Sequence, residues 1–385
     1  MPYLTMGTLT LNPDEVGNYP PVSFVYLRME FGLYSFGDID LDPATSQGVG
    51  AEQQLANTIE RIKLADRAGL DYFGLGEHHR PDYAISAPAT VLAAAAAVTE
   101  RIRIGSAVTV LSTEDPVRVF QQFSTIDLLS HGRAELVAGR GSFIESFPLF
   151  GANLSDYDAL YAEKLELLLA LNESERITWQ GQFRPSLDDA LILPRPVGTP
   201  TNPGKLDIWI ATGGNPQSSA RAGMLGLPVS YAIIGGYPER FAPLFDLYRR
   251  AATQSGHDAS TLKTAIAGPG FIGKGSKAAK DAFFPYWATS MARISKERGF
   301  PTPTREGYDE MTGPRGAIFG GSPNEVADKI IATHGHLGND RVGLQMDWSG
   351  VPQPLMMESI ELFATEVAPQ VNKELGARSQ PVSIE

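Results

Sequence analysis

Two kinds of segment alternate along the chain, and they differ in how often apolar positions recur. Short stretches that are almost continuously apolar predict buried strands. They lie at residues 30–36, 70–77, 102–111, 134–141, 206–213, 227–235, 264–273 and 341–348. Longer segments, in which apolar residues recur every three or four positions, predict amphipathic helices. They lie at residues 52–69, 87–100, 116–132, 157–172, 215–225, 238–256, 322–335 and 354–369.

Strands that alternate with helices in this way point to one fold class. A helix between successive strands is the connection that parallel strands require, and eight such units close into a barrel. We therefore predict an α/β fold, a (β/α)8 TIM barrel with insertions, with residues 29–385 as a single domain. An open, doubly wound sheet is the alternative, but it usually contains fewer units.

Three segments depart from the repeat. Residues 1–28 are irregular and contain Pro20 and Pro21, so we expect an N-terminal extension there. Residues 176–205 predict a hairpin followed by a proline-rich approach to the fifth strand. Residues 283–320 are rich in proline, glycine and aromatic residues, and we expect them to form a lid or flap over the barrel mouth.

Composition and charge exclude several classes of function. The net charge of −12 and the lack of a basic stripe argue against nucleic acid as a partner. The longest apolar run, residues 91–98, is far shorter than the roughly 20 residues that cross a membrane. The first residues lack an export signal, and the chain has no cysteine for disulfides, thiolate metal sites or a nucleophile. We expect a cytoplasmic protein that contacts neither nucleic acid nor membrane.

The barrel prediction sorts the histidines by face. His78 and His79, in the stretch GLGEHHRPDY, follow the second strand directly, on the face where such barrels carry their chemistry. Three others, His131, His334 and His336, lie at helix ends on the opposite face, where an imidazole can cap backbone carbonyls. The adjacent pair is therefore the candidate for function.

Metal binding and acid–base chemistry are the two functional interpretations of that pair. A zinc site needs three or four converging ligands, whereas neighbouring residues that leave a strand point in different directions. We therefore expect no metal. An unperturbed imidazole titrates near neutral pH, which makes His78 a candidate acid or base. A histidine that only caps its own loop is the alternative, and the role of Glu77 stays open.

A glycine-rich turn after the fifth strand is a candidate anion site. Glycine lets a backbone approach a ligand closely, and the free N–H groups at a helix start attract phosphate. The residues concerned are Thr212, Gly213, Gly214, Asn215 and Ser218. An ordinary turn with asparagine as the helix N-cap is the alternative.

Two other strand ends carry candidates. Arg140 follows the fourth strand, where a guanidinium can bind a phosphate or, equally, form a salt bridge at the rim. Ser106, Ala107 and Val108 are small residues at the end of the third strand, which leaves room for a flat ring or reflects simple core packing. The alanine run at residues 93–97 either packs against the barrel or forms a close helix–helix dimer contact.

Taken together, these stretches resemble the bacterial luciferase-like flavin monooxygenases over roughly residues 30–370. The resemblance is densest from AGLDYFGLGEHH, through GSAVTVLSTEDPVRVFQQFSTIDLLSHGRAELVAGRG, to FPLFG. It implies reduced FMN at the barrel mouth, with the phosphate against Arg140, Ser218 and the turn at residues 213–215. It also implies that the flavin ring lies beside Ala107 and Val108, where the family often has a nonprolyl cis peptide, and that His78 is the active-site histidine in the reaction of flavin with oxygen.

The resemblance also implies partners. We expect O2, a small apolar organic substrate and, because no NAD(P)H fingerprint is present, a separate NAD(P)H:flavin reductase. It favours a homodimer through the helices at residues 87–100 and 116–132, which include the alanine run. Strand-end residues Phe36, Met346 and Trp348, with the predicted flap, are expected to line the substrate pocket.

The chain departs from the family at two positions. Gly139 stands where luciferase has a reactive cysteine, and Asp158 stands where the family has a second phosphate-binding arginine. Light emission is therefore not implied. The deazaflavin F420, acting in hydride transfer, is the alternative cofactor, and a flavin-binding protein without turnover is the alternative from outside the enzymes.

Overall fold

The computed structural model describes residues 28–39, 48–141 and 143–378. The predicted N-terminal extension lies outside the described residues except for Arg28, whose guanidinium pairs with Asp71 at 2.5 Å. None of the helices in the described ranges combines the length and apolarity needed to cross a bilayer.

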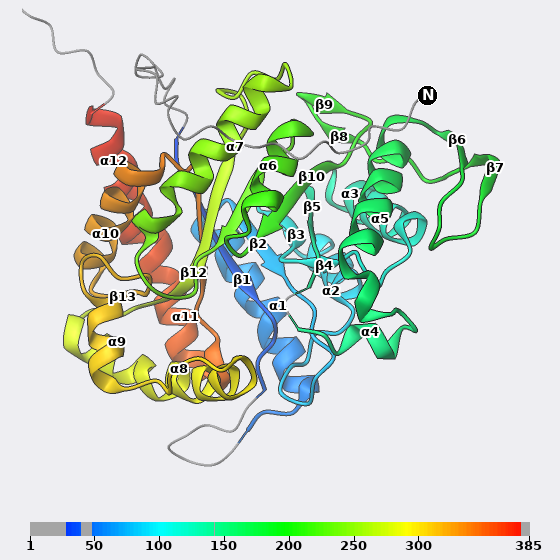
Figure 1. Cartoon of the computed structure of the whole chain (residues 1–385). Helices are drawn as coiled ribbons and strands as arrows, with labels where there is room; N and C mark the ends of the chain where they lie inside the picture. The colour runs from blue at the N-terminus through cyan, green and yellow to red at the C-terminus, as the bar shows by residue number, and fades with distance from the viewer. Residues whose placement is uncertain (1–27, 40–47, 142, 379–385) are drawn as a thin grey trace, which may run out of the picture.

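Parallel strands close into a barrel at the centre of the molecule (Figure 1). In chain order they are β1 Glu30–Ser35, β2 Tyr72–Leu75, β3 Arg103–Ser106, β5 Ala134–Gly139, β10 Asp207–Thr212, β11 Val229–Ala232, β12 Thr264–Ile272 and β14 Arg341–Gln345. Each predicted strand is present. The pairing of β14 with β1 and of β5 with β10 closes the ring, so the closed barrel is confirmed and the open sheet is wrong.

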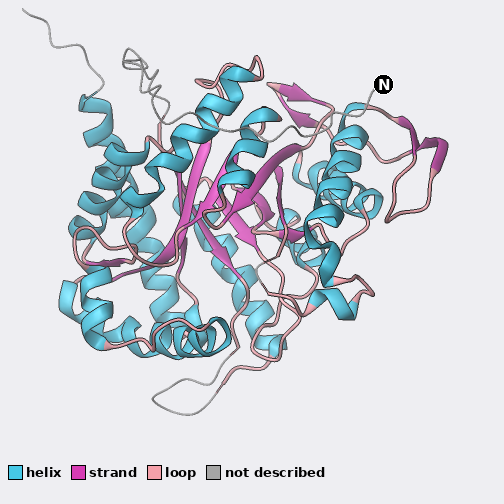
Figure 2. Ribbon diagram, viewed as in Figure 1, coloured by secondary structure: helices cyan, strands magenta, loops and turns pink. Residues whose placement is uncertain are grey.

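Helices surround the barrel, as Figure 2 shows. They include α1 Ala51–Ala68, α2 Pro88–Ala96, α3 Pro116–Ser130, α5 Tyr157–Glu173, α6 Pro216–Met224, α7 Ala242–Gln254, α10 Pro323–Leu337 and α11 Gln353–Leu362, which continues through a π-turn into α12 Ala368–Arg378. Their ends follow local chemistry. The Asp115 carboxylate accepts from two backbone N–H groups at the start of α3, and Ser322 and Glu325 form a capping box on α10.

A buried ion cluster fills the barrel near the strand starts. Arg341 on β14 contacts the carboxylates of Glu30 at 2.6 Å and Glu135 at 2.6 Å. Its guanidinium lies 4.6 Å from the Tyr72 ring and 4.4 Å from the Trp209 ring. Burial opposes ionisation of Glu30, but the surrounding cations outweigh burial and lower its pKa to about 2. This cluster occupies the end of the barrel where the strands begin, and Arg341, Tyr72 and Trp209 line the bottom of the cavity that opens at the other end.

The insertion at residues 176–205 is the predicted hairpin. Strands β6 Arg176–Trp179 and β7 Leu187–Leu191 pair antiparallel. A second short pair, β8 Gly198–Thr199 with β9 Asn202–Pro203, follows before the chain enters β10.

The predicted lid or flap at residues 283–320 is not a long loop. The chain forms α8 Ser276–Arg298, α9 Arg305–Thr312 and β13 Phe319–Gly321 instead. Aromatic residues of this segment are buried on one face of α8, where Phe283 stacks on Phe271 with ring centroids 5.3 Å apart. Burial of this face favours a helix despite Pro285 within it. The C-terminal half of α8 lies at the barrel mouth, where the flap was expected.

Candidate active site

A cavity of about 1010 Å3 opens at the C-terminal ends of the barrel strands. Its size is at the upper end of the range for small-molecule sites, roughly 300–1,000 Å3. Most of the predicted site residues line it. They are Phe36, His78, Ala107, Val108, Arg140, Thr212, Gly213, Asn215 and Trp348. Strands far apart in the sequence are thus brought to one mouth, as barrel geometry requires.

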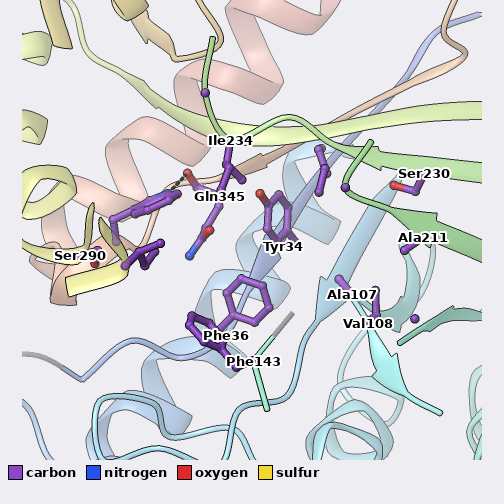
Figure 3. Close-up of a pocket in the computed structure, with 18 of the residues that line it drawn as sticks. Tyr34, Phe36, Ala107, Val108, Phe143, Ala211, Ser230, Ile234, Ser290 and Gln345 are labelled. Carbon is purple, nitrogen blue, oxygen red and sulfur yellow. Dashed lines mark hydrogen bonds between the residues drawn. The ribbon is translucent and has the colours of Figure 1, made fainter. Parts of the chain in front are cut away.

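His78 lies in an aromatic cage. Its side chain is 9% exposed, and the rings of Phe36, Tyr83 and Phe143 have centroids 4.6, 4.6 and 4.7 Å from the imidazole. Nδ1 of His78 lies 3.4 Å from Oε1 of Glu145, which comes from the loop after β5. Figure 3 shows Phe36 and Phe143 between Ala107 and Val108 on one side and Ser290 of α8 on the other. These rings pack around the imidazole, which also lines the cavity, and the carboxylate lies beside one of its nitrogens.

Glu77 interacts with the second histidine rather than with His78. Its Oε1 lies 3.4 Å from Nε2 of His79, whose ring packs edge-on against Phe150 at 5.0 Å. The hydrogen bond that the His79 ring donates to Glu77 raises the pKa of His79 above its ordinary value, and burial opposes this only in part. The two histidines therefore have different carboxylate partners and belong to different pairs.

The Ala107–Val108 peptide bond is cis, as the resemblance implies. It divides the predicted third strand into β3 and a short β4, Thr109–Val110. Ser106 does not face the cavity, because its buried hydroxyl accepts from the Val137 N–H at 3.0 Å and donates to the Val137 carbonyl at 3.1 Å. The expected cofactor contact by the Ser106 side chain is therefore not supported by its position.

Gly139 packs directly against the Val108 side chain. A Cβ at Gly139 would lie 2.5 Å from Cγ2 of Val108, closer than two carbons can approach without movement. The absence of a side chain here is thus a steric requirement of the Val108 position. A cysteine, as in luciferase, does not fit unless Val108 moves.

Phosphate binding by Arg140 stays a prediction, whereas Arg140 does form the salt bridge that was the alternative. It lines the cavity, and its Nη1 also contacts Oδ1 of Asp158 at 2.5 Å. Nη2 donates to the hydroxyl of Ser218 at 3.2 Å, and the guanidinium lies 5.3 Å above the Tyr157 ring. Arg140 therefore connects β5 with the first turns of α5 and α6.

The glycine-rich turn is both a cavity wall and an N-capped helix start. The Thr212 hydroxyl accepts from the N–H groups of Gly214 at 3.3 Å and Asn215 at 3.2 Å. The Asn215 amide oxygen accepts from the Ser218 N–H at 3.2 Å. Gly214, with φ +106°, and the buried Ser218 do not line the cavity, whereas the open space beside Gly213 would accept a ligand. The predicted residues come together, but part of their hydrogen-bonding capacity is already used within the turn.

The rest of the cavity is mainly apolar. Its walls include Tyr34, Ile234, Trp287, Met291, Ile294 and Trp348. Met346 was predicted here wrongly, because it lies behind the wall and its sulfur accepts a hydrogen bond from Ser359 of α11 at 3.4 Å. Neighbouring residues at a strand end point to opposite sides, so Gln345 faces the cavity and Met346 faces the helices.

Sequence reasoning missed Glu145 and the α8 residues. Glu145 stands six positions beyond the strand that carries Gly139, with no local pattern to relate it to His78. In the sequence, the side of α8 that lines the cavity was indicated only by the aromatic content of the segment. In the described ranges there is no group of three or more His, Asp or Glu side chains that could hold a metal ion.

Comparison with known proteins identifies the family. The model of the luciferase-like monooxygenases matches residues 29–340, which is most of the chain. The chain belongs to this family. Among curated relatives of this luciferase-like monooxygenase, the uncharacterized protein y4vJ of Sinorhizobium fredii is 26% identical over 84% of this chain and 93% of its own length. The 4-hydroxyprotoasukamycin monooxygenase of Streptomyces nodosus subsp. asukaensis is 25% identical over 90% of this chain and 94% of its own.

Solved structures share the fold of this luciferase-like protein. Monooxygenase RslO1 of Streptomyces bottropensis superposes with a TM-score of 0.75 at 23% identity, over 89% of this chain and 99% of its own. The oxygenating constituent of 3,6-diketocamphane monooxygenase from Pseudomonas putida, solved with FMN, gives 0.69 at 21% identity over 90% and 99%. The coenzyme F420-dependent tetrahydromethanopterin reductase of Methanopyrus kandleri gives 0.67 at 17% over 90% and 100%. At these identities the likeness establishes the barrel alone.

Proposed function

We propose that this luciferase-like protein is an FMN-dependent monooxygenase that uses reduced flavin and O2 to oxidise a small apolar organic molecule. The observation that carries the proposal is the position of His78, caged by aromatic rings and paired with Glu145, in the same cavity as Ala107, Val108 and Arg140. A proton-transferring group, a flat apolar surface and a cation thus face one space.

The residues present fit a flavin that carries a phosphate. Arg140 and the Ser218 hydroxyl would hold the phosphate, with the open backbone at Gly213 beside them. Ala107 and Val108 would lie against the ring. Reduced flavin, when bound, supplies the electrons that activate O2, so that one oxygen atom enters the substrate and the other leaves as water.

The side chains of the chain then provide binding and proton control. His78 can hold or release a proton at the nitrogen that does not face Glu145, with its ring fixed by its aromatic neighbours. The wall formed by Trp287, Met291 and Trp348 favours an apolar substrate and excludes water.

Two partners complete the proposal. A separate NAD(P)H:flavin reductase would supply the reduced flavin, which agrees with the absence of an NAD(P)H fingerprint in the sequence. A homodimer through α2 and α3 would cover the apolar side chains that these helices and the turn after α2 expose, with exposed fractions of 48% at Val98, 40% at Leu128 and 49% at Leu129.

An F420-dependent hydride-transfer enzyme is the second candidate, and the similarity of this chain to F420-dependent enzymes supports it. Equilibrium titration with FMN, reduced FMN and F420 distinguishes the candidates. We expect FMN to bind with Kd below about 100 μM, a free energy of about −5.5 kcal/mol. If none of the three binds below that concentration, the proposal fails; if only F420 binds, the second candidate replaces it.

A further inference from the structure

The phosphate-binding candidate Arg140 already has an anionic partner from its own chain. Nη1 lies 2.5 Å from Oδ1 of Asp158, and Nη2 donates to Ser218 at 3.2 Å. Both terminal nitrogens of the guanidinium are therefore engaged. A phosphate that binds this arginine through Nη1 must displace the carboxylate or share the nitrogen with it.

The two side chains differ in their freedom to move. The Arg140 side chain is 21% exposed and rests on the Tyr157 ring, whereas that of Asp158, in the first turn of α5, is 70% exposed. Asp158 can therefore rotate into solvent while Arg140 stays in place. A phosphate monoester carries about −1.5 to −2 charges at pH 7, so the displaced carboxylate still repels it at short range.

The neighbouring turn offers little compensation. The N–H groups of Gly214 and Asn215 donate to the Thr212 hydroxyl, and that of Ser218 donates to Asn215. Of the other cations, Arg298 lines the same cavity and packs on Phe143 at 4.9 Å, whereas Arg221 packs on Tyr161 at 5.5 Å and is not a lining residue. The charges of Arg140 and Asp158 cancel, so this pair alone offers a phosphate no net positive charge.

We infer that Asp158 competes with the flavin phosphate for Arg140 and thereby sets a weak, readily exchanged cofactor affinity. This inference rests on the proposed function. A flavin that arrives reduced from another protein and leaves oxidised must dissociate in every cycle, and affinity differences of this kind lie mostly in the dissociation rate. Asp158 thus determines how tightly the phosphate is held, without contact with the reacting ring.

Binding of FMN and of riboflavin, which lacks the phosphate, tests the inference. Dissociation constants are measured by flavin fluorescence for the wild type, for Asp158→Asn and for the control Asp156→Asn. Asp156 lies on the same turn, and within the described residues it forms no ion pair. We expect Asp158→Asn to tighten FMN binding about tenfold, or about 1.4 kcal/mol, and to leave riboflavin within about twofold. The gain should shrink as salt rises from about 0.05 to 0.5 M.

Two results would overturn the inference, and a different result would overturn the proposed function. An FMN affinity of Asp158→Asn that is unchanged or weaker would overturn the inference, because Asp158 would then only hold Arg140 in place. An equal gain for riboflavin would overturn it too, since the effect would not depend on the phosphate. Absence of flavin and F420 binding to the wild type would instead overturn the proposed function.

Discussion

Arg80 and Glu297 form a bidentate ion pair, with Nη1–Oε2 at 2.7 Å and Nη2–Oε1 at 2.6 Å. The pair joins the loop after β2, which carries His78, to the last turns of α8. A second link runs from Arg293 to Asp82 at 2.9 Å. The C-terminal end of α8 is thereby fastened over the cavity mouth.

The first prediction concerns this fastening. Glu297→Gln should loosen the end of α8 and increase cleavage by a protease around residues 295–304, while global stability falls by less than about 1 kcal/mol. Limited proteolysis and urea unfolding measure the two effects. Glu306→Gln, an exposed carboxylate on α9, is the control. Equal cleavage rates for both variants would show that the ion pair does not restrain the helix.

The second prediction separates the two histidines. His78→Ala should keep FMN affinity within about twofold but slow the oxidation of bound reduced flavin at least about tenfold, because general acid–base groups typically contribute 10²–10⁴. His79→Ala removes the pair with Glu77 and should have the smaller effect on that rate. Stopped-flow mixing with O2 gives the rates. An unchanged rate in His78→Ala would remove this residue from the mechanism.

The third prediction concerns Glu145 as the positioning residue for His78. Glu145→Leu leaves Nδ1 of His78 without its acceptor and should slow the same oxidation about tenfold. Glu145→Gln retains an acceptor oxygen without the charge. Recovery in Glu145→Gln would show that orientation of the ring is what matters, and no recovery would show that the charge is needed. If Glu145→Leu matches the wild type, the pairing has no role in the reaction.

The fourth prediction links pH to stability through Lys329. Its ammonium is buried and donates to the carbonyls of Thr312 at 3.0 Å and Ile318 at 2.7 Å, and burial lowers its pKa from 10.5 to about 7. Between these values the unfolded chain binds more protons than the folded one, so this group makes stability rise with pH from about 7 to 10.5.

Urea unfolding at several pH values checks this linkage. The stability of the wild type relative to Lys329→Met should increase across that window and level off below about pH 7. Lys373→Met, at an exposed position, should show no such trend. A difference between wild type and Lys329→Met that is constant with pH would contradict the assignment.

The fifth prediction tests the space beside the cis peptide. Gly139→Cys places a Cβ 2.5 Å from Val108 and should destabilise the protein by about 1–3 kcal/mol, as overpacking does. Adding Val108→Ala removes the methyl groups but keeps a Cβ 2.9 Å away, so it should recover part of that loss in urea unfolding. Failure of the double variant to recover would place the strain elsewhere.

Local patterns in the sequence were sufficient for the barrel and for several positions in the site. Strand and helix periods are set within a few residues, so the eight strands and eight helices of the repeat were found near their observed bounds. Because the ends of parallel strands meet at one face, His78, Arg140 and the turn at 212–215 could be placed together before the structure was known. The resemblance added the cis bond at Ala107–Val108.

Tertiary structure decided which side chains meet. Gln345 and Met346 leave the strand end in opposite directions. Apolar content does not predict which of the two side chains faces the cavity. The partners Glu145 of His78 and Asp158 of Arg140 come from loops and helices whose approach depends on how whole units pack. Periodicity is a property of neighbours in sequence, whereas an ion pair is a property of neighbours in space. The sequence therefore determined the barrel and its candidate residues, and only folding determined their partners and the helical cover of the mouth.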